Sequence, residues 1–281
     1  MTKIYYMTIR CQGKLIDLTA PIVMGILNLT PDSFHDGGRY TDIDAILHQT
    51  EKMLHEGAGI IDIGGMSSKP GSAIIEAGEE LTRVIEPIEA IKKRFPEAIL
   101  SIDTIHATVA EQAVQAGCSI VNDISAGMLD AAMLPTVARL QVPYIIMHMR
   151  GTPATMQDNP TYTNVITEVM DFLAARVQAC RAVGINDIVI DPGFGFGKTI
   201  EQNYQLLHLL SHFAMLGCPI LAGLSRKSMI TKVLNIKNED ALNGTTVLNT
   251  IALLQGANIL RVHDVKEAID AITIVQKLQV S

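Results

Sequence analysis

The sequence has no excess of basic residues. Its 281 residues include 22 Lys and Arg against 29 Asp and Glu, which gives a formal net charge of −7 at pH 7. A protein that binds nucleic acid through its backbone needs a basic stripe to neutralise the phosphates, and none is present. Nucleic acid is therefore not expected as a partner, and any phosphate that binds must be met by a few local cations.

The sequence also lacks cysteine motifs and long apolar runs. Its four cysteines are scattered, without the spacing that would indicate a zinc site or a redox dithiol. No stretch reaches the roughly 20 uninterrupted apolar residues of a membrane span, and the N-terminal segment has no apolar core typical of a secretion signal. We expect a reduced, cytoplasmic protein that does not associate with membranes.

No linker, composition shift, low-complexity segment or solenoid-type repeat divides the chain, so one domain over 1–281 is expected. Hydrophobic residues make up 48% of the sequence and charged residues 18%, which is enough apolar material for a large core. Eight short and almost continuously apolar runs are typical of buried parallel strands. They are Ile22–Leu27, Ile60–Ile63, Ile99–Ile102, Ser119–Val121, Tyr144–Met147, Ile188–Ile190, Ile220–Ala222 and Ile259–Val262.

Amphipathic segments alternate with these runs and predict helices. The segments are Ile43–Glu56, Glu79–Arg94, Ala107–Ala116, Ala131–Leu140, Val165–Val183, Glu201–Leu216, Lys227–Leu234, Asn243–Gln255 and Val265–Leu278. Eight β/α units in one chain predict a (β/α)8 TIM barrel. Ahead of the first unit, Ile4–Arg10 and Lys14–Leu18 flank a turn with a glycine, which predicts an N-terminal β-hairpin over 1–18 that covers the bottom of the barrel.

Several predicted strands end in a carboxylate or an amide: Asn28, Asp62, Asp103, Asn122 and Asp191. The C-terminal ends of barrel strands surround one cavity, so these side chains are expected to converge although tens of residues separate them. A single strand-end Asp or Asn can equally start a turn or cap a helix. As a set, these residues favour a polar heterocycle with several N–H groups.

Positive charge follows the last two predicted strands. Ser225-Arg226-Lys227-Ser228 comes shortly after one of them, and Arg261-Val262-His263-Asp264 spans the end of the other. Barrels often bind phosphate on the loops after these strands, and arginine grips phosphate oxygens with a planar fork. A diphosphate is therefore expected here. Asn28 offers an oxygen suited to Mg²⁺ that is held mainly by phosphates and water.

The glycine-rich segment 191–198 does not have the spacing of a common nucleotide-binding loop. It reads DPGFGFGK, which is neither GxxxxGK[ST] nor GxGxxG. We therefore reject nucleoside triphosphates and dinucleotides as its ligand. The glycines instead permit close approach of the backbone to a flat ligand beside Asp191.

The segment Met24–Phe34, MGILNLTPDSF, resembles the first signature of the dihydropteroate synthase family and is highly specific. Later segments resemble the rest of that pattern in the same order, as far as the last helix. They are 62–71, 101–104, 122–124, 191–198, 225–228 and 261–264. The resemblance implies a homodimeric transferase of folate synthesis that is a sulfonamide target. It would join 6-hydroxymethyl-7,8-dihydropterin diphosphate to 4-aminobenzoate, with Mg²⁺ as cofactor.

The resemblance also implies roles for individual residues. The pterin would be bound by Asp103, Asn122, Ile124, Met147, Asp191, Phe196, Gly223 and Lys227. The diphosphate would be held by Asn28, Asp62, Ser68, Arg261 and His263, with Asn28 as the metal ligand. The 4-aminobenzoate pocket would be framed by Phe34, Lys69, Pro70, Lys227 and Ser228. The role of Asp62 stays open, because it could act through water or a metal or could hold the first loops in place.

One loop departs from the family pattern. Many relatives read GGESTRPG where this chain reads GGMSSKPG over 64–71, so Ser68 keeps the hydroxyl and Lys69 keeps the charge without the bidentate arginine fork. Two other functions remain open. A pterin-binding methyltransferase with a corrinoid partner would not need Asn28, Lys227 and Arg261 together. A catalytically silent paralogue would bind pterin without turnover, although the intact loops argue against it.

Overall fold

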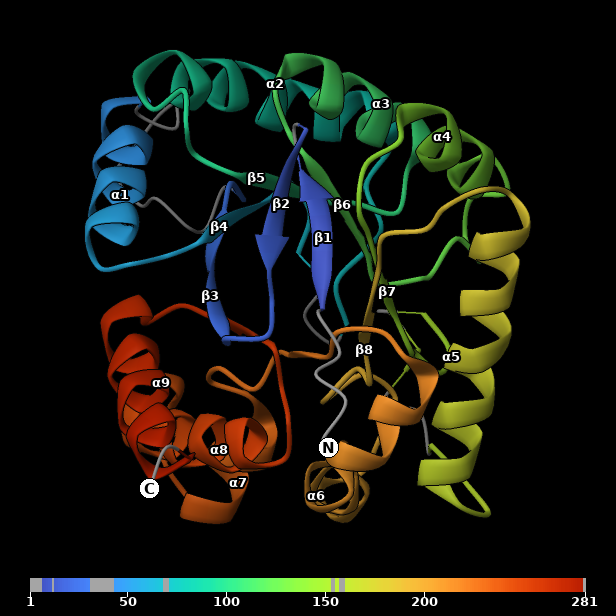
Figure 1. Ribbon diagram of the computed structural model, residues 1–281, viewed down its shortest axis with the longest axis vertical. Helices are drawn as coiled ribbons and strands as arrows, with labels where there is room; N and C mark the ends of the chain where they lie inside the picture. The colour runs from blue at the N-terminus through green and yellow to red at the C-terminus, as the bar shows by residue number, and fades with distance from the viewer. Residues whose placement is uncertain are drawn as a thin grey trace, which may run out of the picture.

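The computed structural model describes residues 7–11, 13–30, 43–67, 71–152, 155–156 and 160–279. Within these ranges the chain forms a ring of parallel strands surrounded by helices (Figure 1). The strands of the ring are β3 (Ile22–Asn28), β4 (Ile60–Gly64), β5 (Leu100–Asp103), β6 (Ile120–Asp123), β7 (Tyr144–Met147), β8 (Ile188–Asp191), β9 (Leu221–Ala222) and β10 (Ile259–Val262). The predicted (β/α)8 barrel is confirmed.

The strands pair in the order β8-β7-β6-β5-β4-β3-β10-β9. The ring closes between β8 and β9, where the pairing is sparse. A single parallel bridge joins Ile190 to Ile220, and the backbone N–H of Ile190 donates to the carbonyl of Pro219 at 2.9 Å. This contact is the seam of the barrel.

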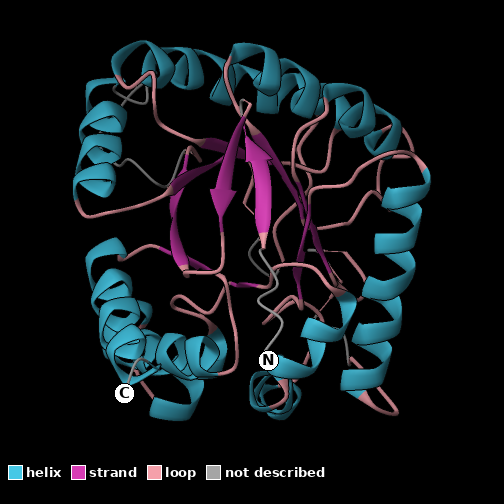
Figure 2. Cartoon of the chain, viewed as in Figure 1, coloured by secondary structure: helices cyan, strands magenta, loops and turns pink. Residues whose placement is uncertain are grey.

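The helices lie outside the ring in both ribbon views (Figures 1 and 2). They are α1 (Ile43–His55), α2 (Ala77–Arg94), α3 (Ala107–Ala116), α4 (Met133–Leu140), α5 (Val165–Ala182), α6 (Ile200–His208), α7 (Ser228–Leu234), α8 (Leu242–Leu254) and α9 (Val265–Gln279), with short 3-10 helices at Leu210–Leu216 (η1) and Asn238–Asp240 (η2). In the part of the chain that the structure describes, no helix is long and apolar enough to cross a membrane.

One predicted helix is wrong as a single element. The segment Glu201–Leu216 was expected to be continuous, but α6 ends at His208 and the chain continues as the 3-10 helix η1. Leu209 leaves the helical conformation, with φ −108° and ψ 21°. The tighter winding still delivers Leu210 and Phe213 to the core, so the apolar pattern alone does not reveal the change.

Side chains of the strands alternate between the helices and the inside of the barrel, as the pleat requires. On β4, Ile61 and Ile63 pack outward into the core under the helices, whereas Ile60 packs inside the barrel. The two faces of a barrel strand therefore carry different tasks. The outward face builds the main core, and the inward face is left to fill the bottom and to form the mouth.

The bottom of the barrel is an apolar layer closed by a hairpin. Strands β1 (Thr8–Cys11) and β2 (Lys14–Asp17) pair antiparallel within the predicted hairpin, of which residues 1–6 and 12 lie outside the described residues. Figure 1 shows this hairpin across one end of the barrel. The layer contains Ile9, Cys11, Leu18, Met24, Ile60, Ile120, Ile145, Val189, Leu221 and Ile259. The hairpin therefore seals the end opposite to the predicted site.

Candidate active site at the mouth of the barrel

Three residues of the predicted set, Asn28, Asp103 and Asn122, lie at one level of the barrel together with Gly64. In the register of β3 to β6, Asn28 pairs with Gly64, Gly64 with Asp103, and Asp103 with Asn122. A side chain added at Gly64 would reach both neighbours, because a Cβ there would lie 3.7 Å from Asn28 Oδ1 and 3.7 Å from Asp103 Cβ. The expected convergence of these polar residues is therefore present, and Gly64 keeps the space between them free.

Arg261 bridges two carboxylates of the mouth. Its Nε donates to Asp62 Oδ2 at 2.6 Å, and its Nη2 donates to Asp103 Oδ2 at 2.7 Å. Asn122 Nδ2 donates to the same oxygen of Asp62 at 3.0 Å. Burial opposes the charge of Arg261, but Asp62 and Asp103 outweigh it and raise the pKa of the guanidinium. The cation expected to meet a phosphate is thus paired with two acids in this structure.

Asp103 is the more accessible of the two acids. Its side chain is 12% exposed, whereas that of Asp62 is fully buried. Burial raises the pKa of the Asp103 carboxyl to about 7, and the nearby guanidinium of Arg261 acts in the opposite direction. Asp103 is therefore placed to exchange its ion pair for hydrogen bonds to a ligand.

Asp191 and Lys227 approach the mouth from the other side of the ring. Asp191 ends β8, and its Oδ1 accepts a hydrogen bond from the backbone N–H of Gly193 at 2.7 Å. A Cβ at Gly223 would lie 3.8 Å from Asp191 Oδ2, so this glycine leaves room beside the carboxylate. Lys227 Nζ lies 4.2 Å from the centroid of the Phe196 ring. Carboxylate, ammonium and aromatic ring therefore lie in one region, as predicted.

Burial perturbs the pKa values of both Asp191 and Lys227. Burial raises the pKa of Asp191 and lowers that of Lys227 to about 8, while the charge of each group supports the charge of the other. Groups with perturbed pKa values that gather at one end of a barrel are a common sign of a functional site. The electrostatics thus point to the mouth.

Apolar side chains form a small cluster of their own at the mouth, separate from the two larger cores. It contains the three predicted residues Ile124, Met147 and Phe196 together with Met66, Ile105 and Met156. The last three were missed from the sequence. Ile105 lies two residues after Asp103, and this closeness to a strand-end acid is the signal that could have found it. The cluster supplies an apolar wall for a flat ring beside Asp103, Asn122 and Asp191.

The glycine-rich loop after β8 is fixed by a buried lysine. Lys198 Nζ donates to the carbonyls of Gly193 at 2.8 Å, Phe196 at 3.0 Å and His148 at 3.3 Å, and it lies 2.9 Å from His148 Nδ1. Burial lowers the pKa of this lysine. Lys198 therefore ties the loop that carries Phe196 to the loop after β7.

Two glycines of the same loop permit this contact. Gly193 and Gly197 have φ of +73° and +64°, a region that favours glycine. A Cβ at Gly193 would lie 1.9 Å from the carbonyl oxygen of His148, and one at Gly197 would lie 2.5 Å from that of Arg150. Gly193 and Gly197 thus serve backbone packing between two loops, and the close approach of this segment to a flat ligand stays a prediction.

The remaining polar residues of the two predicted cationic segments, 225–228 and 261–264, lie beyond β9 and β10. Arg226 forms a two-pronged ion pair with Asp264, with donor distances of 3.1 and 2.6 Å. His263 is exposed, and its Nδ1 lies 2.9 Å from Ser225 Oγ. Ser228 is exposed at the start of α7. Arg226 is therefore neutralised within the protein, whereas His263 and Ser228 face solvent at the mouth.

Glu80 on α2 is a further buried acid behind the mouth. Its Oε2 accepts a hydrogen bond from Thr104 Oγ1 at 2.9 Å, and its Oε1 has no partner among the described residues. Burial raises the pKa of this carboxyl to about 7. Thr104 directly follows Asp103, so Glu80 supports the end of β5 from outside the ring.

Part of the predicted site lies outside the described residues. Phe34, Ser68, Lys69 and Pro70 belong to this part. Their predicted contacts with 4-aminobenzoate and diphosphate remain predictions.

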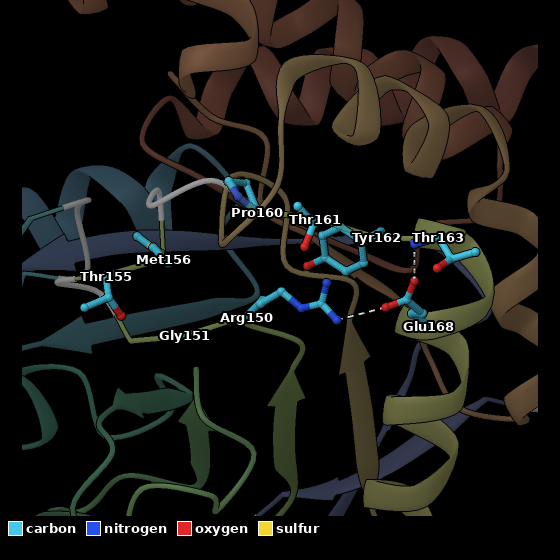
Figure 3. A pocket seen from close by; sticks show the side chains of 9 residues that line it. All are labelled: Arg150, Gly151, Thr155, Met156, Pro160, Thr161, Tyr162, Thr163 and Glu168. Carbon is cyan, nitrogen blue, oxygen red and sulfur yellow. Dashed lines mark hydrogen bonds and ion pairs between the residues drawn. The ribbon is translucent and has the colours of Figure 1, made fainter.

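A pocket of about 520 Å³ lies beside the loop after β7 and shares Met156 with the apolar wall of the mouth (Figure 3). None of the predicted residues lines it. Arg150 in this pocket forms an ion pair with Glu168 at 2.8 Å and lies 4.0 Å from the centroid of the Tyr162 ring. Its charge is therefore already balanced, and the converging acids and cations make the mouth of the barrel the candidate substrate site.

Comparison with known proteins identifies the class. The family described as "Pterin binding enzyme" matches residues 24–263. The dihydropteroate synthase of Haemophilus influenzae is 44% identical over 272 residues, covering 96% of this chain and 98% of that protein. That of Escherichia coli K12 is 43% identical over 273 residues, covering 96% of each. The chain thus belongs to the pterin-binding enzymes and, within them, to the dihydropteroate synthase family of transferases.

Solved structures agree with this assignment. The Yersinia pestis dihydropteroate synthase in a sulfonamide drug complex superposes with a TM-score of 0.92 at 42% identity, covering 98% of this chain and all of that one. The Xanthomonas albilineans dihydropteroate synthase with 4-aminobenzoic acid gives a TM-score of 0.92 at 40% identity, covering 99% of this chain and all of that one. The similarity therefore extends over the whole barrel.

Proposed function

We propose that this chain condenses 6-hydroxymethyl-7,8-dihydropterin diphosphate with 4-aminobenzoate to give 7,8-dihydropteroate and pyrophosphate, a step of folate biosynthesis. The observation that carries this proposal is the arrangement of the mouth, where buried acids and an apolar wall lie next to Arg261 and Lys227. Acids suit the N–H groups of a pterin, and cations suit its diphosphate.

The pterin ring would lie between the acids and the apolar wall. Asp103 and Asp191 would accept hydrogen bonds from its ring N–H and amino groups, and Asn122 can both donate and accept. Lys227 would donate to an acceptor on the ring. Its lowered pKa leaves it mostly protonated near neutral pH. The faces of the ring would pack against Ile124, Met147 and Phe196, and Gly223 leaves room for its edge.

The diphosphate would lie over Arg261 and His263. Mg²⁺ at this place is a proposal that fits the residues present. Asn28 has a neutral amide oxygen at the mouth, and the described residues contain no group of three or more His, Cys, Asp or Glu that could hold a metal. Such a site suits an ion held mainly by diphosphate oxygens and water, and the ion would help to neutralise the leaving pyrophosphate.

4-Aminobenzoate would enter above the pterin. Lys227 and Ser228 lie at the start of α7, on the mouth side of the ring. The ammonium of Lys227 and the hydroxyl of Ser228 would meet the carboxylate of this substrate, and Phe34, Lys69 and Pro70 would complete the pocket. Lys227 could then contact both substrates.

The chemistry requires charge stabilisation and exclusion of water. The C–O bond between the pterin methylene and the diphosphate breaks, and its electron pair leaves with pyrophosphate. The amino nitrogen of 4-aminobenzoate bonds to the cationic methylene and then releases a proton to water. Arg261 stabilises the developing negative charge, and no protein nucleophile is needed. The apolar wall keeps water away from the cation.

A homodimer formed through α8 and α9 is part of the proposal. The helices pack against each other, and α8 buries Leu248 and Ala252 beneath them. Its outer face is apolar as well, with Val247 51% and Leu254 52% exposed. A helix that carries large apolar side chains on its outer face as well as its inner face is normally covered on both sides, so a second copy is expected to cover this face. Sedimentation of the purified chain measures the assembly state.

A cytoplasmic location stays a prediction.

The test of function is an assay with purified protein. The chain is expected to form dihydropteroate from the two substrates in the presence of Mg²⁺ and not after chelation, and a sulfonamide is expected to compete with 4-aminobenzoate. Product formation is followed by chromatography. A chain that binds the pterin tightly but forms no dihydropteroate would contradict the proposal and favour a silent paralogue.

A residue-level comparison sharpens the assay. Asp191→Asn keeps the shape of the side chain but removes the charge that faces the pterin. It should raise the KM for the pterin diphosphate by about tenfold or more, because hydrogen bonds to charged groups contribute about 1.5–3 kcal/mol. The KM for 4-aminobenzoate should remain unchanged. Equal changes in both KM values would remove Asp191 from the pterin site.

A further inference from the structure

Asp62 lies one layer below the other strand-end acids. It occupies the middle of β4, in register with Ile26 of β3 and Ser101 of β5, whereas Asp103 lies level with Gly64 at the end of that strand. Its side chain is fully buried. A negatively charged group at this depth is poorly placed to touch a diphosphate and would repel it.

The contacts of Asp62 are few and directed. Its Oδ2 accepts from Arg261 Nε at 2.6 Å and from Asn122 Nδ2 at 3.0 Å. Its Oδ1 is buried without a hydrogen-bond partner among the described residues. Within that part of the chain, Arg261 is the only cation paired with this carboxylate. The Asp62 carboxylate therefore depends on Arg261 for charge balance, whereas Asp62 is one of two acids that hold Arg261.

The two arms of Arg261 are held differently. The Nε arm binds a carboxylate that solvent does not reach, and the Nη2 arm binds Asp103, which is 12% exposed and faces the mouth. A ligand with N–H groups can replace Nη2 on Asp103 but cannot reach Asp62. The Nη2 arm is exchangeable, and the Nε arm is fixed.

We infer that Asp62 is a positioning residue for the leaving group: it anchors Arg261 through Nε while the Nη2 arm moves from Asp103 to the diphosphate as the pterin takes over Asp103. This inference rests on the proposed function. It replaces a direct contact of Asp62 with diphosphate or metal by a contact through Arg261. Recognition of the ring and handling of the diphosphate are then coupled through one side chain.

The experiment is a double-mutant cycle with Asp62→Asn, Arg261→Ala and both together. Asp62→Asn should lower kcat/KM for the pterin diphosphate by about tenfold or more, weaken inhibition by pyrophosphate and leave the KM for 4-aminobenzoate unchanged. In the Arg261→Ala background the same substitution should change kcat/KM by less than about twofold, because residues that act through one another are not additive. Asp171→Asn, at an exposed position on α5, is the matched control and should change nothing.

Thermal unfolding gives a second readout that needs no turnover. Arg261→Ala leaves Asp62 buried without its cation, so the Tm should fall by several degrees, and adding Asp62→Asn should raise it again. Equal losses from Asp62→Asn in both backgrounds would overturn the inference, and so would a selective rise in the Mg²⁺ requirement of Asp62→Asn.

The two proposals fail in different ways. If the wild-type chain forms no dihydropteroate, the proposed function fails. The Tm cycle, together with calorimetric titration of pyrophosphate into the same four proteins, then still decides whether Asp62 acts through Arg261. Pyrophosphate binding that weakens in Asp62→Asn but does not weaken further in the double variant, relative to Arg261→Ala, supports the inference. Equal weakening in both backgrounds overturns it.

Discussion

The same strands form both ends of the barrel interior, but their inward side chains are apolar at the bottom and polar at the mouth. At the bottom, inward positions such as Ile60, Ile120 and Ile259 form an apolar layer beneath the hairpin. Two residues further along the same strands, the inward positions are Asp62, Asn122 and Arg261, joined by hydrogen bonds. Along these strands the inward side chains change from apolar to polar within two residues. The apolar layer stabilises the barrel, and the polar layer forms the candidate binding site.

The difference shows what a buried charge needs. Asp62 is as deeply buried as Ile60 but has a guanidinium within 2.6 Å. Burial of an unpaired charge is costly, whereas burial of a well-matched pair can be nearly neutral. Acids inside the barrel are therefore tolerated where a cation such as Arg261 balances them.

The largest expected effect comes from placing an acid in the bottom layer. Ile60→Asp puts a carboxylate on the same face of β4 as Asp62 but without a cation, so it should lower the free energy of unfolding by about 4 kcal/mol or more. Circular dichroism and thermal melts measure the loss. Ile60→Val is the control and should cost about 0.5–1.5 kcal/mol. A folded Ile60→Asp protein with an unchanged Tm would show that the two ends do not differ in this way.

A smaller effect is expected from loss of the lysine that ties two loops of the mouth together. Lys198→Met leaves the carbonyls of Gly193, Phe196 and His148 without their shared donor, and it should lower the free energy of unfolding by about 2–4 kcal/mol. The KM for the pterin diphosphate should rise because Phe196 loses its support.

Denaturant melts and steady-state kinetics measure the two consequences of Lys198→Met. Lys232→Met on α7 removes an exposed lysine and should stay within about 0.5 kcal/mol of wild type. If the Lys198→Met protein is destabilised but its KM for the pterin diphosphate is normal, Lys198 stabilises the fold without contributing to ligand binding.

The smallest effect is on the pH dependence of the free energy of unfolding, and it comes from Glu80 behind the mouth. Burial raises the pKa of Glu80 from 4.5 to about 7, so between these values the folded protein holds a proton that the unfolded chain has lost. The free energy of unfolding therefore decreases as pH rises through this window. Glu80→Gln should be more stable than wild type at about pH 8, by about 1–3 kcal/mol, and similar to it at about pH 4.

Thermal melts of both proteins across this range test the sign of the effect. Glu89→Gln on the same helix is the control, since Glu89 is exposed. A Glu80→Gln protein that is less stable than wild type at high pH would show that the contacts of the carboxylate, such as that from Thr104, outweigh the cost of burying its charge.

Much of the fold could be predicted because inward and outward positions leave a clear pattern. Asp62, Asp103, Asn122 and Asp191 stand out as polar residues in or directly after apolar strands. The sequence could not say which face each one occupies. Asp123 looks equivalent to Asn122, yet its oxygens accept hydrogen bonds from Ser125, Gly127 and Tyr144, so it serves the loop after β6.

Partners across the barrel were beyond the reach of the sequence. Arg261 is separated from Asp62 by 199 residues and from Asp103 by 158, and nothing local indicates that it pairs with both. The predicted phosphate contact of Arg261 took no account of these two acids. The apolar wall was underestimated for a similar reason, because Met66 and Met156 lie in loops without a periodic pattern.

Because of the seam between β8 and β9, ligand binding at the site should also affect the stability of the barrel. This is the part of the ring with the fewest backbone hydrogen bonds, and Asp191 and Gly223 lie just beyond it on either side. A ligand that contacts both Asp191 and Gly223 would connect β8 to the segment after β9 across the seam. Its binding free energy also adds to the few contacts between β8 and β9, so a filled site should make the protein harder to unfold.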